Sequence, residues 1–519
     1  MTATGQQERQ QIARRAGVVA AGTLASRMLG LVRDQVMAAM FSLAVTDAFT
    51  IAFLLPNVLR QLLAEGAVQS AVLPVLSATR EREGDAATKR FFAAVRGLSL
   101  CLLTLVTVLG IVFAPLLVDL FAPGFREQPG QFERTLSFTR GVFPYLFFMG
   151  TAALGVAALN SYHRFAAAAF APLLLNVAFV ALALAMPAWL VQRGYDPGLA
   201  LVCAALVGGV LQVLAQWPSL AKIGFLTRPS LEFGHPGVRE VLRRMGPVLI
   251  GTGVYYVDTL LARRFLSELG EGAPSYFNWA LRLCDFPQGI FVMALQSAAL
   301  PSLARLAAKQ DGDELSRTFS FGLRLALFVA VPATALCMVL AEPLVVLLFQ
   351  RGAFDANSAH ETGRALVAQA AGIWLVAAVR QLVAVYYAFG DTRTPVVVAS
   401  LDLLAFIAAA LLLRGPFGHV GVSLAVSCAS AVQAGLLWWW LKRHLKQRRT
   451  AEILSSFARI VVAAAIAAAA AWAVARLFSA LQLRAVIGSA VFALSYFAAA
   501  LLLRCRELEV VSARLRRRA

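Results

Sequence analysis

Residues 16–41 read AGVVAAGTLASRMLGLVRDQVMAAMF, an apolar run that carries three ionisable side chains near its middle. An α-helix rises 1.5 Å per residue, so about 20 apolar residues are enough to cross the hydrocarbon core of a bilayer. This run reaches that length. It has no small-residue cleavage site of the kind that ends a signal peptide, so we predict that it remains as the first transmembrane helix.

Comparable runs recur along the whole chain. Of its 519 residues, 60% are apolar and 14% are charged, whereas soluble domains carry about a quarter charged residues. The runs are unbroken rather than alternating, which excludes a transmembrane β-barrel. We therefore predict an all-α polytopic membrane protein with about 14 transmembrane helices. The predicted spans are 17–42, 46–78, 91–121, 136–160, 166–190, 198–221, 241–267, 275–304, 319–349, 362–389, 394–413, 417–441, 458–477 and 483–503.

The net charge of +19 is distributed according to this predicted topology. Its basic clusters fall before the first span, after the last and between alternate spans, which places all of them on one side of the membrane. The positive-inside rule makes that side, with both termini, cytoplasmic. Topology and contact with anionic phospholipid headgroups then explain the charge, and we predict no nucleic-acid binding. The clusters lie at 9–15, 80–90, 222–244, 305–317, 442–449 and 504–518.

An internal repeat divides the chain. Residues 69–74 read QSAVLP and residues 296–301 read QSAALP, about 227 positions later; APLLVDLF at 114–121 is followed at a similar interval by EPLVVLLF at 342–349. Six predicted spans separate the copies, so the two halves are parallel repeats, and transporters of this kind bind their substrates between the halves. We predict two six-helix lobes related by a pseudo-twofold axis along the membrane normal, plus two C-terminal helices. The predicted parts are an N-lobe at 1–225, a C-lobe at 226–447 and a two-helix appendix at 448–519.

Charged side chains inside the spans require protein or water around them. An ionised group at the centre of a transmembrane helix costs about 2.5–3.5 kcal/mol on insertion scales. The guanidinium fork of arginine binds phosphate oxygens in a bidentate geometry that lysine cannot copy, and no lysine belongs to this set. We therefore predict an internal cavity for a phosphate- or pyrophosphate-bearing substrate. Its arginines are Arg27 and Arg33 in the first span, Arg60 in the second and Arg282 in the eighth.

Three acids accompany these arginines, namely Asp34, Asp47 and Glu65. We favour structural ion pairs for them. Arg27 and Asp34 are seven positions apart and share one helix face, whereas Arg33 lies about 120° round the helix from Arg27. One straight helix face therefore cannot present both arginines.

Two further acids are candidates for a driving cation. Asp258 lies in the seventh predicted span and Asp402 in the eleventh. Single acids inside transmembrane helices are typical of sodium or proton sites. Arg263 and Arg264 follow Asp258, however, and neutralisation by them is the alternative interpretation.

The cysteines and histidines show no catalytic or metal-binding pattern. The six cysteines are scattered, form no CxxC and are predicted to pack without disulfides. The five histidines form no HxxxH, and the chain has no glycine-rich phosphate loop or nucleophile motif. We therefore predict a transporter without a cofactor rather than a membrane enzyme. A non-transporting scaffold is a further alternative, which differs in that it would tolerate Arg→Ala in the first two spans.

Several longer motifs resemble those of one family. SRMLGLVRD at 26–34, TDAF at 46–49 and PNVLRQLLAEGA at 56–67 look like the signature of the MurJ (MviN) lipid II flippases, within the multidrug/oligosaccharidyl-lipid/polysaccharide exporter superfamily. The resemblance covers essentially the whole chain in order. Further matches are LN at 159–160, RF at 164–165, AP at 171–172, Arg282 with FP at 286–287, and GDTRTP at 390–395.

This resemblance implies a fold, an activity and a location. The fold has fourteen helices around a V-shaped cavity. The activity moves lipid II, the undecaprenyl-pyrophosphate-linked peptidoglycan precursor, from the cytoplasmic to the periplasmic leaflet of the bacterial inner membrane. Membrane potential, sodium or protons would drive it, and the expected partners are lipid II, phospholipids and peptidoglycan-synthesis proteins around a monomer. The resemblance assigns cavity arginines to Arg27, Arg33, Arg60 and Arg282, cavity or gating acids to Asp34, Asp47 and Glu65, and a lipid-tail groove to the last two helices.

The chain departs from the family pattern at two places. Gln61 stands where a second arginine often follows the one at Arg60, so the cavity is expected to be one charge less positive. The polar pair that sodium-binding members carry in the eleventh span falls on Phe406 and Ala410, which leaves Asp402 as an untested substitute. The alternative function is that of another exporter of the superfamily, for a polysaccharide-linked lipid or a drug.

Overall fold

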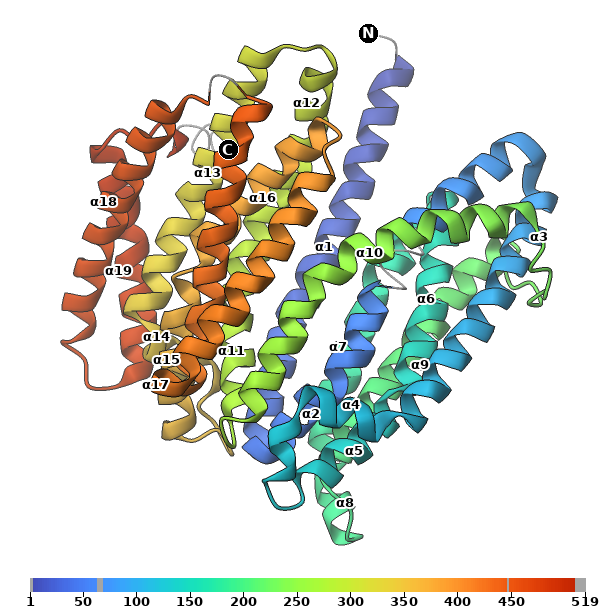
Figure 1. Ribbon diagram of the computed structural model, residues 1–519, viewed down its shortest axis with the longest axis horizontal. Helices are drawn as coiled ribbons and strands as arrows, with labels where there is room; N and C mark the ends of the chain where they lie inside the picture. Colours follow the sequence, from blue (N-terminus) through green and yellow to red (C-terminus); the bar gives the residue numbers. More distant parts are fainter. Residues whose placement is uncertain (1–2, 63–68, 446–447, 509–519) are drawn as a thin grey trace. The chain divides into compact units, whose positions relative to one another are not determined.

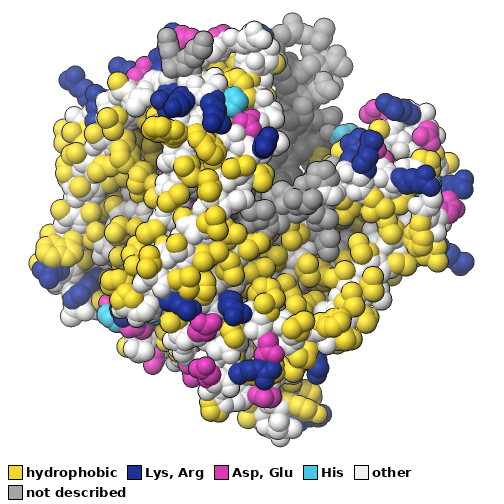
Figure 2. All heavy atoms as spheres, viewed as in Figure 1, with side chains coloured by type: hydrophobic (Ala, Val, Ile, Leu, Met, Phe, Trp, Pro, Cys, Tyr) yellow, Lys and Arg dark blue, Asp and Glu magenta, His cyan; other side chains and the backbone are white. Residues whose placement is uncertain are grey.

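The computed structural model describes residues 3–62, 69–445 and 448–508, and every regular element within them is a helix (Figure 1). The chain forms two compact units, Met1–Gly272 and Ala273–Ala519. On the face drawn in Figure 2, hydrophobic side chains cover the middle of each unit, and Lys, Arg, Asp and Glu gather toward its two ends. That distribution is typical of bundles that cross a bilayer.

The helices of the first unit follow one another through short connections. Long helices alternate with short ones, and several breaks coincide with proline at the start of the next helix. The elements are α1 (Ala3–Met40), α2 (Leu43–Leu59), α3 (Gln69–Val112), α4 (Ala114–Phe121), the 3-10 turn η2 (Pro123–Arg126), α5 (Gln131–Val142), α6 (Pro144–Ser161), α7 (Phe165–Ala185), α8 (Pro187–Gln192), α9 (Leu199–Lys222) and α10 (Pro236–Ser267).

Helix α7 packs against both α1 and α9. Its approach to α1 is close at Gly22, where a Cβ atom would lie 2.7 Å from the carbonyl oxygen of Ala169. Small residues at such crossings let helix backbones come near each other in membranes. An aromatic cluster joins α2 to α7, with ring centroids of Phe49 and Phe53 5.4 Å apart and Phe179 5.8 Å from Phe49. The N-terminal half of the chain thus places α1, α2 and α7 side by side.

The second unit repeats this order of long and short helices. It contains one π-helical turn directly after Pro287, and turns of this kind often occur at functional sites. The elements are α11 (Ala273–Pro287), the π-helical turn η3 (Gln288–Val292), α12 (Met293–Ala308), α13 (Gly312–Val339), α14 (Ala341–Phe349), α15 (Ala356–Ala370), α16 (Ile373–Ala388), α17 (Arg393–Trp440), the 3-10 turn η4 (Leu441–Arg443), α18 (Thr450–Ala475) and α19 (Leu481–Leu502).

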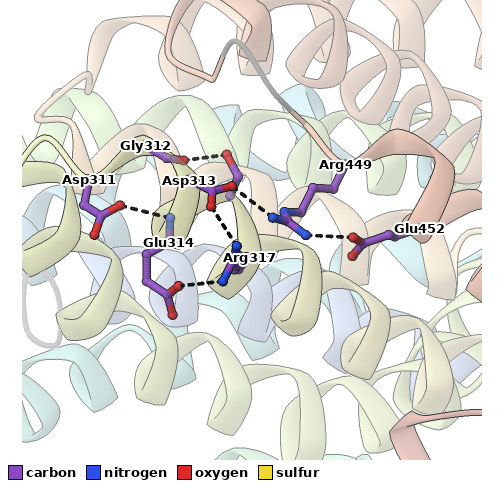
Figure 3. A network of polar contacts seen from close by, with 8 residues as sticks. Asp311, Gly312, Asp313, Glu314, Arg317, Arg449 and Glu452 are labelled. Atoms are coloured by element: carbon purple, nitrogen blue, oxygen red, sulfur yellow. Dashed lines mark hydrogen bonds and ion pairs between the residues drawn. The ribbon is translucent and has the colours of Figure 1, made fainter.

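A charged network joins the first turns of α13 and α18 (Figure 3). Asp311 caps α13, since its Oδ1 accepts a hydrogen bond from the backbone N–H of Glu314 at 3.1 Å. Arg449, just before α18, donates to Asp313 Oδ1 at 2.9 Å and to Glu452 Oε1 at 2.7 Å. One arginine therefore bridges two helix starts that lie far apart in the sequence.

A second contact, buried rather than exposed, fixes the segment after α19. Glu507 is 2% exposed, and its Oε1 lies 3.2 Å from Nη1 of Arg324 on α13. The hydroxyl of Ser456 on α18 donates to the same oxygen at 2.9 Å. The end of the described chain is thus tied to both α13 and α18.

The prediction of an all-α polytopic membrane protein is confirmed. Ten helical segments in the described part of the chain are long and apolar enough to cross a membrane. One of them, Arg393–Arg443, contains two helices joined at Gly418, whose φ of +57° breaks the helical path. Three predicted spans that carry more charge are not among these ten segments. The first span corresponds to α1, the seventh to α10 and the eighth to α11 together with α12. Together these elements account for the fourteen predicted spans.

The repeated motifs adopt the same local structure in both units. APLLVDLF forms α4 after a break at Phe113, and EPLVVLLF lies within α14 after a break at Leu340. Phe113 has φ −89° and ψ 10°, and Leu340 has φ −112° and ψ 26°. The third and ninth predicted spans are therefore each a long helix followed by a short one. This agreement supports the internal repeat that the sequence predicts.

The compact units and the predicted lobes divide the chain differently. Helix α10 packs on α3 and α4 within the first unit, which extends to Gly272. The repeat assigns the same helix to the second lobe. The division into 1–225, 226–447 and 448–519 describes repeated sequence, and it stays a prediction.

Candidate functional site

Helix α1 carries two candidate arginines, and one of them, Arg33, contacts α7. Its Nε and Nη2 donate to Oδ1 of the neighbouring Asp34 at 2.9 Å and 2.7 Å. Its Nη1 donates to Oδ1 of Asn176 at 3.2 Å, and its Cζ lies 5.6 Å from the ring centroid of Phe179. The side chains of Arg33 and Asp34 are only 15% and 11% exposed. The predicted structural pairing of Asp34 is thus present, with Arg33 as its partner.

Asn176 completes this contact. Its Nδ2 donates to the backbone carbonyl of Ser26 at 3.0 Å, about two helical turns before Arg33 on α1. The amide therefore satisfies a backbone group and an arginine at once. Sequence reasoning did not select Asn176. The available signal was a single amide in the otherwise apolar run 165–185.

Arg27 differs from Arg33 in its surroundings. Helix α1 runs without interruption from Ala3 to Met40, so the two arginines point about 120° apart, as predicted. The Arg27 side chain is half-buried and makes no hydrogen bond or ion pair to any residue that the structure describes. Its five N–H donors are available to a ligand.

The candidates on α2 are held at its two ends. Arg60 follows the last residue of α2, and its Nε and Nη2 both donate to Oδ1 of Asn57, each at 3.1 Å. Asp47 is fully buried in the first turns, and its Oδ2 accepts a hydrogen bond from the backbone N–H of Gly272 at 2.6 Å. Asp47 therefore fixes the end of the first unit, and Glu65 lies outside the described residues.

Arg282 belongs to the second unit. It is an exposed residue of α11, five positions before Pro287 and the π-helical turn that follows. Arg27, Arg33 and Arg60 belong to the first unit. The structure thus brings Arg33 together with Asp34 and places the four arginines on α1, at the end of α2 and on α11.

The two candidate cation ligands lie in different units. Asp258 on α10 is half-buried, and its Oδ1 accepts from the backbone N–H of Thr259 at 2.9 Å. Arg264 donates to the carbonyl of Leu120 at 2.5 Å, so it is engaged with α4. Asp402 is a half-buried residue of α17.

No cluster of three or more His, Cys, Asp or Glu side chains suited to a metal ion occurs within residues 3–62, 69–445 and 448–508. The positions of the polar pair, Phe406 and Ala410, are both fully buried apolar residues. A cation site at Asp258 or Asp402 therefore remains a prediction.

Together, the helical fold and the charged residues on its first helices define a polytopic membrane transporter. Solved structures of membrane transporters share this fold. An inward-facing multidrug resistance MATE family transporter of the MOP superfamily aligns with a TM-score of 0.68 and 15% identity, over 82% of this chain and 96% of that one. A structure of the lipid II flippase MurJ in an inward closed conformation aligns with a TM-score of 0.77 and 20% identity, over 94% and 98%.

Sequence comparison identifies the family. The family model for lipid II flippase MurJ matches residues 36–491. The lipid II flippase MurJ of Burkholderia cenocepacia is 34% identical over 421 residues, which is 80% of this chain and 81% of that protein. A probable lipid II flippase MurJ of Vibrio cholerae is 32% identical over 430 residues, 81% of each chain. The chain belongs to the lipid II flippase MurJ family and is a multi-pass inner-membrane protein.

Proposed function

We propose that this protein moves lipid II from the cytoplasmic to the periplasmic leaflet for peptidoglycan synthesis, by alternating access and without a chemical step. The observation that carries the proposal is its membership of the lipid II flippase family over most of its length. The guanidinium groups on α1 and α2 supply the chemistry that a pyrophosphate needs. An exporter of cations would instead require acidic side chains in its cavity. A drug exporter would not require guanidinium groups that bind phosphate oxygens in a bidentate geometry.

The arginines have different roles in this mechanism. Arg33 is held by Asp34 and Asn176, so its charge is positioned and partly neutralised before the substrate arrives. Arg27 has its donors uncommitted within the described structure and is the primary ligand of the pyrophosphate. Arg60 and Arg282 complete the binding set. Asp34, Asp47 and Glu65 act as cavity or gating acids.

Complementation tests these roles. In a bacterium depleted of its own flippase, Arg27→Ala, Arg33→Ala, Arg60→Ala and Arg282→Ala are each expected to abolish growth while the proteins remain in the membrane. Arg27→Lys keeps the charge without the fork and is expected to support only slow growth. The matched control is Arg351→Ala, because that arginine is exposed and, among the described residues, its guanidinium hydrogen-bonds the carbonyls of its own helix at Leu347 and Leu348. Normal growth of all four stable variants would contradict the binding set.

The energy source belongs to the same proposal. One charge that crosses 100 mV gains about 2.3 kcal/mol, so membrane potential alone can bias the return step. If sodium or a proton is coupled through Asp258 or Asp402, Asp258→Asn and Asp402→Asn reduce translocation in vesicles, and sodium removal or a change in pH reproduces the defect. If the wild-type translocation rate does not change with sodium concentration or pH, and both Asn variants remain active, the membrane potential would be the only energy source of the proposal.

Both termini are cytoplasmic in this proposal, and the protein works as a monomer beside phospholipids and peptidoglycan-synthesis proteins. The basic clusters then face the anionic inner leaflet. The lipid tail follows α18 and α19, while the headgroup remains with the arginines.

A further inference from the structure

A cavity of about 320 Å³ lies at one end of the second unit. It is formed where α13 gives way to α14, where α18 ends and where α19 begins, with α15 closing one side. This is the opposite end of α13 and α18 from the network at Arg449. Three arginines from three elements line it: Arg364 on α15, Arg476 after α18 and Arg484 on α19.

Two of these arginines have donors to spare. Arg484 is anchored by Nε, which donates to the carbonyl of Phe478 at 2.7 Å. Its Nη1 and Nη2 donate to no residue in the described ranges. The Arg476 Cζ lies 4.1 Å from the ring centroid of Trp472, and its guanidinium hydrogen-bonds to none of the described residues either. A preoriented guanidinium fork with unused donors is the group that binds phosphate oxygens best.

The acids near the cavity already have partners. Glu342 lines it, and its Oε2 lies 3.4 Å from Nδ1 of His360. Arg364 is paired with Glu361, at 3.0 Å between Nη1 and Oε2. A neutral His360 leaves Glu342 with its negative charge, so Arg476, Arg484 and Glu342 together give the cavity a net charge of +1. An anionic ligand fits this lining better than a zwitterionic one.

Exposed apolar side chains occur beside the cavity arginines. Trp472, which lines the cavity, is 51% exposed; Leu477, next to Arg476 in sequence, is 79% exposed, and Val486, two positions after Arg484, is 54% exposed. They lie at the ends of two membrane-spanning helices, at the level where tryptophan and arginine meet lipid headgroups. Exposed aliphatic side chains beside a basic cavity suit a ligand that carries both a phosphate and hydrocarbon chains.

We propose that this cavity binds the headgroup phosphate of an anionic phospholipid through Arg476 and Arg484, with the acyl chains lying along the exposed sides of α18 and α19. The bound lipid joins the α18–α19 hairpin to α14 and α15. The cavity lining includes none of the four arginines assigned to the pyrophosphate, Arg27, Arg33, Arg60 and Arg282.

Lipid binding to the purified full-length protein tests this proposal. Short-chain phosphatidylglycerol is titrated in detergent and followed by native mass spectrometry. The double variant Arg476→Gln/Arg484→Gln is expected to weaken binding about tenfold or more, since it removes two charge-assisted contacts. Arg351→Gln, an exposed arginine outside the cavity, is the matched control and leaves binding unchanged. Equal binding by the double variant would overturn the site.

Two comparison ligands identify the chemistry. Phosphatidylcholine with the same chains is expected to bind much more weakly, because it has no net negative charge. Inorganic phosphate is expected to compete poorly, because it lacks chains. Phosphatidylcholine that binds equally well, or phosphate that competes at the same concentration as the lipid, would contradict a site for anionic lipid.

A wild-type experiment covers the case in which the double variant does not fold. Photoreactive phosphatidylglycerol in vesicles is expected to label residues 472–484, as mapped by peptide mass spectrometry. Labelling confined to other helices would overturn the proposal.

Discussion

Asn176 is the residue on which the position of Arg33 depends most directly. It accepts from Arg33 and donates to the carbonyl of Ser26, while Asp34 holds the other side of the guanidinium. Hydrogen bonds between transmembrane helices contribute about 0.6 kcal/mol on average. Loss of this amide should therefore affect the orientation of Arg33 far more than the stability of the fold.

We accordingly expect Asn176→Ala to lower lipid II translocation severalfold with little change in melting temperature, both measured on purified protein. Ser26→Ala is the control, because it removes only a 3.4 Å hydroxyl contact and keeps the backbone carbonyl. A large loss of melting temperature in parallel with activity would mean that Asn176 serves the fold and not Arg33.

The candidate arginines could be predicted from the sequence, but their partners could not. A charge in an apolar run stands out because burial of an ionised group is expensive. Asn176 is neutral and lies 143 positions from Arg33, so no local pattern connects them. The sequence predicts an ion pair for Asp34, and the structure shows that its partner is the adjacent Arg33 rather than Arg27, although Arg27 shares its helix face.

At the scale of elements, two contacts that hold α13 and α18 should differ in strength. Arg324 and Glu507 are 15% and 2% exposed, whereas the Arg449 network is open to solvent. Removal of one partner from a buried pair costs about 3–5 kcal/mol, because the other charge is left without compensation. Exposed pairs contribute much less.

Glu507→Ala is therefore expected to lower the melting temperature of the protein in detergent by several degrees, and Arg449→Ala much less. The double variant Arg324→Leu/Glu507→Leu should recover part of the loss, since it leaves no lone buried charge. A double variant as unstable as Glu507→Ala would show that the pair itself, rather than an uncompensated charge, determines the stability.

The connection between α16 and α17 predicts a pH dependence. Burial alone would raise the pKa of the Asp391 carboxyl, but hydrogen bonds from Thr394 and from His444 outweigh it and lower that pKa below its usual value. A lowered pKa in the folded state contributes stability above the unfolded-state value, about 3.9, and this stability is lost as the pH falls through the folded-state pKa. His444 Nε2 lies 2.9 Å from Asp391 Oδ2.

Wild type should therefore lose more thermal stability than Asp391→Asn when the pH is lowered from about 5 to about 3. The measurement is the melting temperature in a pH series, with the two proteins compared at each pH. Identical slopes would remove Asp391 as a source of the acid sensitivity.

The element boundaries mark where hydropathy stops being informative. The third and ninth predicted spans are each a continuous apolar run, and both are broken before a proline, at Phe113 and at Leu340. Hydropathy measures transfer from water and does not report backbone hydrogen bonds. For the same reason, hydropathy does not predict the π-helical turn after Pro287.

At the scale of the whole molecule, composition predicted the class of protein and the repeat predicted matching local structure in its halves. Neither predicts which face of the membrane each loop occupies, because loop charge is the only signal for that property. The proposed topology puts the connection between α14 and α15 in the periplasm and that between α12 and α13 in the cytoplasm.

Alkaline phosphatase fusions test this topology directly. A fusion within residues 351–354 is expected to be active, and one within residues 309–311 inactive, because the phosphatase folds only after export. The reverse pattern would invert the protein and place its basic clusters outside.

The Arg33 and Asp34 pair has a kinetic consequence. Both partners are consecutive residues of α1, so the pair moves with that helix as it slides or rotates. A shift of α1 against α7 therefore exchanges the Asn176 contact but never separates two charges in a medium of low permittivity. Such a shift breaks the hydrogen bond from the Arg33 guanidinium to Asn176 and the bond from Asn176 to the carbonyl of Ser26, but the ion pair stays intact throughout. The movement therefore avoids the cost of leaving an unpaired charge in the membrane.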